Sequence, residues 1–281
     1  MAHDLVIHGG AIPTVLLERL VAITRATAVQ PQPPQAIRLK GAHAHPDIRR
    51  LCGDEGLDYA FLPSTRRLDH YGLLAMDMDS TLITIECIDE VADFAGKKAE
   101  VSAITESAMR GEIDYTESLR RRVGLLAGLP EATLARVYEE RLRLSPGARE
   151  LIAAARKCGL KTMVVSGGFT YFTHRLMDEL SLDYAFSNTL EIVDGHLTGQ
   201  VIGDIVDAQG KAAHVKHIRK SLGLTKEKVI TIGDGANDLL MMAESDLSVA
   251  YHAKPVARDQ AAIALNYTGL DGLLTVLAYA A

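Results

Sequence analysis

The chain has 281 residues, of which 48% are hydrophobic and 23% charged, and its formal net charge is −6. This is the composition of a globular protein with room for one large or two modest hydrophobic cores. The negative charge excludes a general electrostatic attraction to nucleic acid or to an anionic membrane. An anionic substrate must therefore be held by local cations.

The sequence also bounds the compartment. Near the N-terminus, Asp4 and a glycine pair stand where a signal peptide has basic and apolar regions, and no apolar run approaches the ~20 residues of a membrane span. The three cysteines, Cys52, Cys87 and Cys158, are odd in number and widely spaced, which favours structural thiols in a reducing compartment. We expect a cytoplasmic protein that binds neither nucleic acid nor membrane.

Residues 1 to about 70 are predicted to form a separate α/β unit. Its elements are an apolar helix at 13–27, a proline-rich linker at 30–34, a short strand at 36–39 and a helix near 47–52. The linker is the clearest boundary, because proline continues neither a helix nor a central strand. We expect a packing or dimerisation unit, and in the second case the chain would form a homodimer. A ligand-binding regulatory module is the alternative.

The next element is an apolar run at 73–76 that ends in Asp77 and Asp79. This pattern is typical of a buried parallel strand that delivers side chains to the carboxyl edge of an α/β sheet. Two carboxylates this close repel each other unless a cation lies between them or one keeps its proton. Hard oxygen ligands suit Mg²⁺. Alone, the pattern Asp-x-Asp-x-Thr fits a helix-capping loop equally well.

The rest of the chain shows two kinds of pattern. Residues 84–145 have helical periodicity without a clear strand, which predicts a helical insertion. Strands and helices then alternate, which predicts an α/β fold with a parallel sheet and crossover helices. The predicted elements are a helix at 148–158, a strand at 161–165, a helix at 169–180, a hairpin at 190–201, a helix after 210, a strand at 228–232, a helix opened by 233–238 and a strand at 247–250.

Two further positions offer groups that bind anions. At Ser166-Gly167-Gly168, a hydroxyl and accessible backbone N–H groups precede a helix and would form an anion site, unless the segment is an ordinary tight turn. Lys211 lies one helical turn before Val215, on the inward face of its helix. An inward lysine needs an anionic partner.

A second acidic loop completes the set. Asp234 and Asp238 lie one turn apart after an apolar strand, and the neighbouring glycines allow close backbone approach. Two acidic loops, an anion site and one inward lysine together predict a Mg²⁺-assisted phosphoryl-transfer site.

The order Asp-x-Asp-x-Thr, Ser, Lys, Gly-Asp-Gly-x-x-Asp resembles the four motifs of the haloacid dehalogenase (HAD) superfamily phosphatases. The match covers roughly residues 72–270. The local sequence is similar to that of the phosphoserine phosphatases at 76–81, 85–90, 118–123, 165–169 and 233–238. The resemblance implies a Rossmann-like parallel sheet core in a phosphatase domain at 71–281. A helical cap would be inserted after the first core strand, at about 84–145.

The resemblance also implies a reaction. This is the Mg²⁺-dependent hydrolysis of O-phospho-L-serine to L-serine and phosphate, the last step of serine biosynthesis, through an aspartyl-phosphate. Asp77 would be the nucleophile, and Asp79 the general acid and base. The ion would be held by the carboxylates of Asp77 and Asp234 and by the backbone carbonyl of Asp79. Asp238 would lie behind them and orient Lys211 or the metal's waters.

Further roles follow from the same resemblance. Ser166, Gly167 and Lys211 would hold the phosphate oxygens, with Asn237 nearby.

Substrate selection would come from the cap. Arg122 lies within the apolar stripe of Leu119 and Leu126, so it faces inward and can form a fork of hydrogen bonds with a carboxylate. Glu86 begins the first cap helix and is either a first-turn acid or, by the resemblance, the partner of the substrate's ammonium group. Tyr115 stands where the family often has phenylalanine. Its ring would contact the substrate as part of the lid, but its hydroxyl has no assigned role.

Two other functions stay open at this point. A relative of the same superfamily could hydrolyse another small phosphomonoester or transfer the phosphoryl group to an acceptor other than water. A regulatory protein could instead sense an amino acid with its N-terminal unit and carry a vestigial phosphatase part. The intact set of Asp77, Asp79, Ser166, Lys211 and Asp234 argues against the second function.

Overall fold

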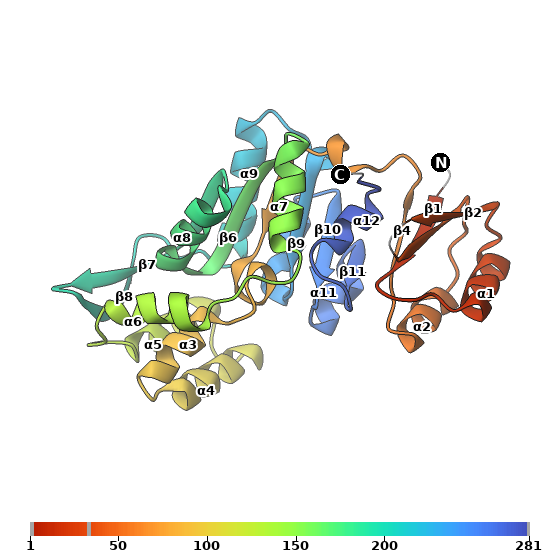
Figure 1. The fold of residues 1–281 in the computed structure, drawn as a ribbon. Helices are drawn as coiled ribbons and strands as arrows, with labels where there is room; N and C mark the ends of the chain where they lie inside the picture. Colours follow the sequence, from red (N-terminus) through yellow and green to blue (C-terminus); the bar gives the residue numbers. More distant parts are fainter. Residues whose placement is uncertain (1–2, 33–34, 280–281) are drawn as a thin grey trace.

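A single mixed sheet runs through the molecule (Figure 1). The computed structural model describes residues 3–32 and 35–279. Within these residues the strands are β1 (His3–His8), β2 (Ala28–Gln32), β3 (Ala36–Lys40), β4 (Asp58–Pro63), β5 (Leu73–Met76), β6 (Lys161–Phe169), β7 (Tyr184–Val193), β8 (His196–Ile202), β9 (Val229–Gly233), β10 (Leu247–Tyr251) and β11 (Ile263–Leu265). Their order in the sheet is β2-β3-β1-β4-β11-β10-β9-β5-β6-β7-β8.

Helices cover the sheet and form the insertion. They are α1 (Thr14–Thr24), α2 (Asp47–Asp54), α3 (Cys87–Phe94), α4 (Lys98–Met109), α5 (Tyr115–Gly124), α6 (Ala132–Arg136), α7 (Ala148–Lys157), α8 (Thr170–Leu180), α9 (Ala208–Ser221), α10 (Leu239–Met242), α11 (Pro255–Gln260) and α12 (Gly272–Val276). Single turns of 3-10 or π type lie at Leu68–His70, Val137–Arg141, Lys226–Lys228 and Ala236–Asp238. Met78–Leu82 is an irregular turn, in which Asp79 and Ser80 have non-helical backbone angles. Among the described residues, none of the helices has the length and apolar character that a membrane crossing requires.

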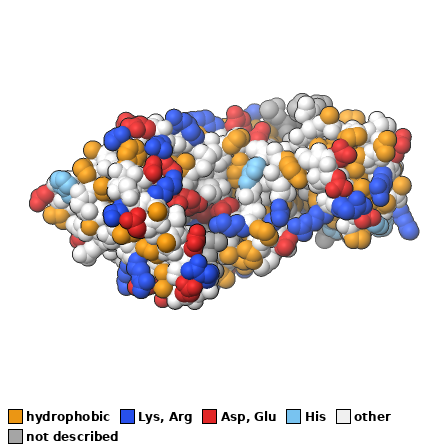
Figure 2. Space-filling view, turned by 90° about the horizontal axis from the view of Figure 1, so that it is seen from below, with side chains coloured by type: hydrophobic (Ala, Val, Ile, Leu, Met, Phe, Trp, Pro, Cys, Tyr) orange, Lys and Arg blue, Asp and Glu red, His pale blue; other side chains and the backbone are white. Residues whose placement is uncertain are grey.

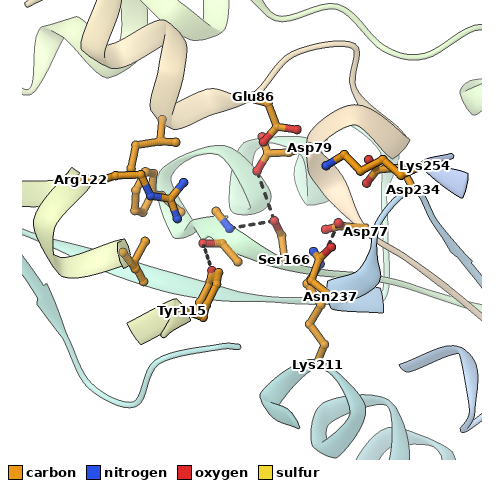
Figure 3. Close-up of a pocket in the computed structure, with 15 residues that line it drawn as sticks. Asp77, Asp79, Glu86, Tyr115, Arg122, Ser166, Lys211, Asp234, Asn237 and Lys254 are labelled. Carbon is orange, nitrogen blue, oxygen red and sulfur yellow. Dashed lines mark hydrogen bonds and ion pairs between the residues drawn. The ribbon is translucent and has the colours of Figure 1, made fainter. Parts of the chain in front are cut away.

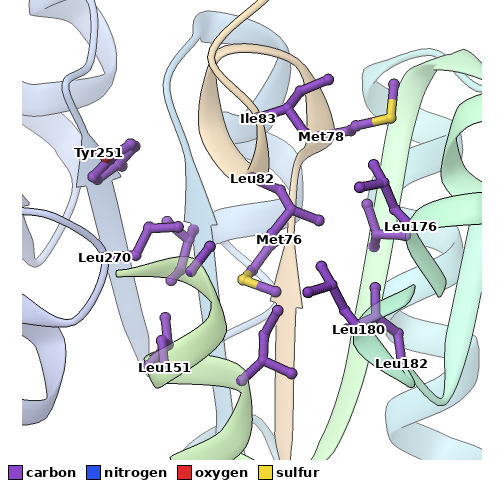
Figure 4. Packing of buried hydrophobic residues seen from close by; sticks show 14 of the residues in the cluster. Met76, Met78, Leu82, Ile83, Leu151, Leu176, Leu180, Leu182, Tyr251 and Leu270 are labelled. Atoms are coloured by element: carbon purple, nitrogen blue, oxygen red, sulfur yellow. The ribbon is translucent and has the colours of Figure 1, made fainter. Parts of the chain in front are cut away.

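The central strand β5 is buried on both faces. Leu74 and Met76 pack in the large apolar cluster that contains residues of α7 and α8, and Figure 4 shows Met76 within it. Leu73 and Ala75 pack on the opposite face, in the cluster that contains residues of α9. Because successive side chains of a strand point to opposite faces, a strand at this place has to be apolar throughout.

The predicted parallel sheet is confirmed. β5 pairs in parallel with β6 and β9, and the parallel pairing continues to β7 on one side and to β10 and β11 on the other. The carboxyl ends of β5, β6 and β9 therefore meet at one edge of the sheet. The sequence patterns missed α11, β11 and α12, which are short elements near the end of the chain.

The helical insertion and the hairpin are also found. Helices α3 to α6 lie between β5 and α7, where helices were predicted at 84–145, and we call residues 84–145 the cap. The hairpin of β7 and β8 turns at Asp194 and Gly195 and projects beyond the sheet, beside the cap (Figure 1). The backbone N–H of Gly128 donates to the carbonyl of Leu197 at 2.8 Å, so the cap is tied to the hairpin.

One prediction for the N-terminal unit was wrong. Residues 30–32 of the expected linker belong to β2, and residues 33–34 lie outside the described residues. β2 pairs only with β3 at the edge of the sheet, where Pro31 is tolerated because its missing N–H can face away from the ladder. Strands β1 and β4 were missed. The predicted strand at 36–39 and the helix near 47–52 are confirmed as β3 and α2.

The N-terminal unit has its own apolar cluster, which includes Leu5, Leu20 and Leu39. The sheet nevertheless continues from this unit into the core, because β4 pairs with β11 at Tyr59 and Ala264. The domain boundary near residue 70 stays a prediction.

The carboxylate of Asp58 joins the two parts. This side chain, only 1% exposed, accepts hydrogen bonds from the backbone N–H groups of Asn266, Tyr267 and Thr268 at 2.7, 3.1 and 2.9 Å. The hydroxyl of Thr268 donates to it at 2.8 Å. One carboxylate of the N-terminal unit thus accepts the hydrogen bonds that the loop after β11 donates.

We predict that Asp58→Ala lowers the free energy of unfolding by about 3 kcal/mol or more, because buried N–H donors lose a charged acceptor. Chemical denaturation measures this change. The matched control is Asp54→Ala on α2, which removes an exposed ion pair with Arg50 and should change stability by less than about 1 kcal/mol. Equal effects of the two substitutions would contradict the role given to Asp58.

Candidate active site

A cavity of about 120 Å³ opens where β5, β6 and β9 end and the cap lies across them (Figure 3). Its lining contains every predicted site residue except Asp238. The polar lining residues are Asp77, Asp79, Glu86, Tyr115, Arg122, Ser166, Lys211, Asp234, Asn237 and Lys254. On the face shown in Figure 2, acidic side chains gather in the middle of the molecule, beside the cap.

Lys211 is the inward lysine that its helix pattern predicted. It is 1% exposed, and its Nζ lies 2.7 Å from Oδ2 of Asp77 and 2.9 Å from Oδ1 of Asp238. Burial by itself would lower the pKa of Lys211, but the carboxylates of Asp238 and Asp77 outweigh this effect and raise the pKa. Burial and the neighbouring Asp238 raise the pKa of Asp77 well above its usual value, while Lys211 opposes this shift.

Asp238 supports this arrangement from behind. Its Oδ2 accepts hydrogen bonds from the backbone N–H groups of Asp234 and Gly235, both at 3.1 Å, while Oδ1 accepts from Lys211. The carboxylate lies so close to Gly233 that a Cβ there would approach Oδ2 to 2.4 Å. The end of β9 therefore requires glycine, which is the close backbone approach that the sequence indicated.

Three carboxylates could hold a divalent metal ion. Ligand oxygens of Asp77, Asp234 and Asp238 all lie within 4.8 Å of one another. Burial, followed by repulsion from Asp238, raises the pKa of Asp234 to about 6. The donor set is hard oxygen with an excess of negative charge, so the residues present fit a divalent cation.

Asp79 reaches the same cavity because the chain turns sharply after β5. Ser80 has a φ of 54°, and the backbone N–H of Cys87 donates to Oδ1 of Asp79 at 2.9 Å. Burial and the nearby Glu86 raise the pKa of Asp79 to about 7. A carboxyl group of this kind can exchange a proton near neutral pH.

Ser166 lies within an extended segment rather than before a tight turn. We expected β6 to end at residue 165, but the strand continues to Phe169, with a shift of register against β7 after Val165. The irregular strand still brings Ser166, Gly167 and Gly168 to the lining of the cavity. The N–H of Gly168 donates to Oγ of Ser166 at 2.9 Å, and that oxygen lies 3.5 Å from Oδ2 of Asp79.

Residues on α5 and at the start of α3 bring the cap to the cavity. Asp114 caps α5 by accepting the N–H of Glu117 at 2.8 Å, which fixes the start of the helix that carries Arg122. None of the ion pairs among the described residues involves Arg122. Its Nε donates to the carbonyl of Ser118 at 3.4 Å, one turn back on α5, and the terminal nitrogens of the guanidinium face the cavity. Glu86 stands directly before α3 and accepts the hydroxyl of Ser80 at 2.7 Å.

The structure also finds a partner for the hydroxyl of Tyr115, which donates to the carbonyl of Gly167 at 3.1 Å.

Sequence reasoning missed Lys254. This residue follows β10, its backbone N–H donates to the carbonyl of Asp234 at 2.9 Å, and its exposed side chain lines the cavity. A signal was present, because β10 is a parallel strand whose carboxyl end faces the same edge as β9. The apolar contacts Ile88 and Phe169 were not singled out either.

Comparisons with known proteins agree with this geometry. The family model of the haloacid dehalogenase-like hydrolases matches residues 74–243. The phosphoserine phosphatase of Polaromonas sp. is 55% identical over 216 residues, which are 75% of this chain and 92% of the relative.

Two solved structures are similar as well. The probable phosphoserine phosphatase of Vibrio cholerae has a TM-score of 0.86 and 39% identity, over 99% of this chain and 86% of the other. A substrate-bound phosphoserine phosphatase complex has a TM-score of 0.69 and 37% identity, over 74% of this chain and 98% of the other. This chain therefore belongs to the haloacid dehalogenase-like hydrolases, in the branch that contains the phosphoserine phosphatases.

Proposed function

We propose that the protein hydrolyses O-phospho-L-serine to L-serine and phosphate, with Mg²⁺ as its cofactor. One observation carries this proposal: a single cavity combines a carboxylate and lysine cluster on the core with a glutamate on the cap and a cap arginine that forms no ion pair within the described residues. The core groups suit a phosphate ester, and the cap groups suit the carboxylate and ammonium of an amino acid. The name and substrate-bound state of similar proteins support the same substrate.

In this mechanism Asp77 is the nucleophile. Its carboxylate attacks phosphorus and forms an aspartyl-phosphate, while the seryl oxygen leaves. Asp79 gives that oxygen a proton. In the second step Asp79 takes a proton from a water molecule that attacks phosphorus, the bond from phosphorus to Asp77 breaks, and phosphate and the free carboxylate result. Lys211 and Ser166, with the backbone N–H of Gly167, bind the phosphate oxygens, so negative charge that develops there meets fixed donors.

The residues that would hold Mg²⁺ are Asp77 and Asp234 through their carboxylates and Asp79 through its backbone carbonyl. The bound ion supplies positive charge that offsets the repulsion between the phosphate and the acidic site. Asp238 orients Lys211 and the loop that carries Asp234.

The cap recognises the serine part of the substrate. Arg122 binds its carboxylate through two hydrogen bonds, and Glu86 binds its ammonium group. The ring of Tyr115 and the side chain of Asn237 complete the walls of the cavity.

The cellular context belongs to the same proposal. Cys52, Cys87 and Cys158 are free thiols, which suits a cytoplasmic enzyme. Its substrate is a small molecule, and we expect it to bind neither nucleic acid nor membrane. We propose residues 1–70 as an appended α/β unit that serves dimerisation, with regulation as the alternative.

The deciding experiment measures phosphate release from a panel of phosphomonoesters, with Mg²⁺ and with a chelator. We expect phosphoserine to be the preferred substrate and activity to vanish in chelator. The variant Asp77→Asn should fold and lose essentially all turnover, because the uncatalysed reaction is among the slowest known. Preference for an unrelated ester, or activity in folded Asp77→Asn, would overturn the proposal.

The proton transfer predicts a pH dependence. Because burial and Glu86 raise the pKa of Asp79 to about 7, the acid form persists up to neutral pH and is lost above it. We expect kcat/KM for phosphoserine to fall above about pH 7, approaching a tenfold decrease for each pH unit. Initial rates between pH 5 and 9 measure this limb, and a flat profile from pH 7 to 9 would contradict the role of Asp79.

Substrate recognition by the cap can be tested with Arg122→Lys and Glu86→Gln. Lysine keeps the charge but cannot form two parallel hydrogen bonds, so kcat/KM for phosphoserine should fall roughly tenfold or more. The exposed neighbour Arg120 provides the matched control Arg120→Lys, which should have no effect.

An aryl phosphate lacks the amino-acid groups, and its slow hydrolysis should change little in these variants. An equal loss on both substrates would show that Arg122 and Glu86 serve the fold or the phosphate site instead.

A further inference from the structure

The hydroxyl of Tyr115 links the cap to the phosphate-binding segment. Tyr115 is the first residue of α5, and its hydroxyl donates to the carbonyl of Gly167 at 3.1 Å across 52 positions of sequence. The contact is close, because a Cβ at Gly167 would lie 2.1 Å from this hydroxyl. Glycine at 167 is therefore required for the tyrosine to reach the backbone.

The carbonyl of Gly167 lies in the irregular part of β6, where the register against β7 shifts. Two side chains hold it there. Asn188, which is fully buried, donates from Nδ2 at 2.8 Å and is itself fixed through Oδ1, which accepts the N–H of Val206 at 2.8 Å. Tyr115 is the second donor and comes from the cap.

The orientation of this carbonyl determines the orientation of the next N–H. The carbonyl of Gly167 and the N–H of Gly168 belong to one planar trans peptide and point in opposite directions. That N–H donates to Oγ of Ser166 at 2.9 Å. With one lone pair of Oγ occupied in this way, the hydroxyl of Ser166 donates into the cavity, where its acceptor is Oδ2 of Asp79 at the long distance of 3.5 Å. A bound phosphate oxygen would take the place of this acceptor.

We infer that Tyr115 is a positioning residue that couples the cap to the phosphate site. Its hydroxyl acts through the peptide between Gly167 and Gly168 to aim the hydroxyl of Ser166 at a phosphate oxygen. The inference rests on the proposed function, which gives Ser166 its role in phosphate binding. It assigns to the hydroxyl of Tyr115 a role that is separate from recognition of the serine part of the substrate. The cap thus adds a second donor to the carbonyl that Asn188 of the core already holds.

The test is the binding of inorganic phosphate to the full-length, Mg²⁺-loaded protein, measured by titration calorimetry. Phosphate has no amino-acid part, so it reports on the core site alone. Tyr115→Phe keeps the ring and removes the hydrogen bond, and we expect the phosphate Kd to rise roughly 3- to 10-fold. In Ser166→Ala, the same substitution should change the Kd by less than about twofold, because the coupled hydroxyl is already missing.

The matched control is Tyr138→Phe. The hydroxyl of Tyr138 also joins the cap to the core, where it donates to Glu179 on α8, but this bond does not touch the phosphate segment. We expect this variant to bind phosphate like the parent. A thermal melt of each variant establishes that it is folded.

Two results would overturn the inference: an unchanged phosphate Kd in Tyr115→Phe, or a full effect of that substitution in Ser166→Ala. Failure of the proposed function is distinguishable, because phosphate binding does not depend on which ester the enzyme prefers. If the panel favoured another phosphomonoester, the expected phosphate results would still support the coupling.

Discussion

The site depends on one buried lysine ammonium group between two carboxylates. Lys211 contacts Asp77 and Asp238, and all three side chains are almost completely excluded from solvent. Buried charges are tolerable only when they are paired. The loop after β5, the loop after β9 and the helix α9 must therefore keep fixed positions relative to one another. The parallel sheet fixes the two loops, because β5 and β9 are direct neighbours whose carboxyl ends coincide.

Division of labour between core and cap follows from this constraint. The core has the buried cluster to which we assign the phosphoryl chemistry, and its glycines let side chains and backbone approach closely. The cap carries Arg122 on α5 and Glu86 directly before α3. If these residues recognise the substrate as we propose, substitution there can change the recognised group without disturbing the cluster. This arrangement suits a fold in which one chemistry serves different phosphate esters. Tyr115 is the point where the two parts share a hydrogen bond.

The N-terminal unit is attached differently. Its own apolar cluster is separate from those of the core, yet β4 extends the core sheet beside β11. Two buried side chains secure the junction: Asp58 accepts donors of the loop after β11, and Arg38 donates to the carbonyl of Val276 at 2.8 Å. In the order of strands these contacts lie beside β11, at one end of the parallel strands, whereas the hairpin of β7 and β8 beside the cap lies at the other end (Figure 1).

The sequence by itself determined what local periodicity encodes. The apolar run of β5, the helical stripe that turns Lys211 inward and the alternation of strands and helices were all readable, because each depends on neighbours within a few residues. The polar ends of parallel strands then predicted which side chains would meet, and the cavity contains them.

Tertiary structure alone decided the long-range contacts. The partner of the Tyr115 hydroxyl is 52 residues away, and the donors to Asp58 are more than 200 residues away. Such pairs leave no periodic trace in the sequence. For the same reason, Pro31 indicated a linker, although pairing with β3 makes its segment an edge strand. Local chemistry specifies the elements, whereas packing between distant segments decides which remaining polar groups find each other.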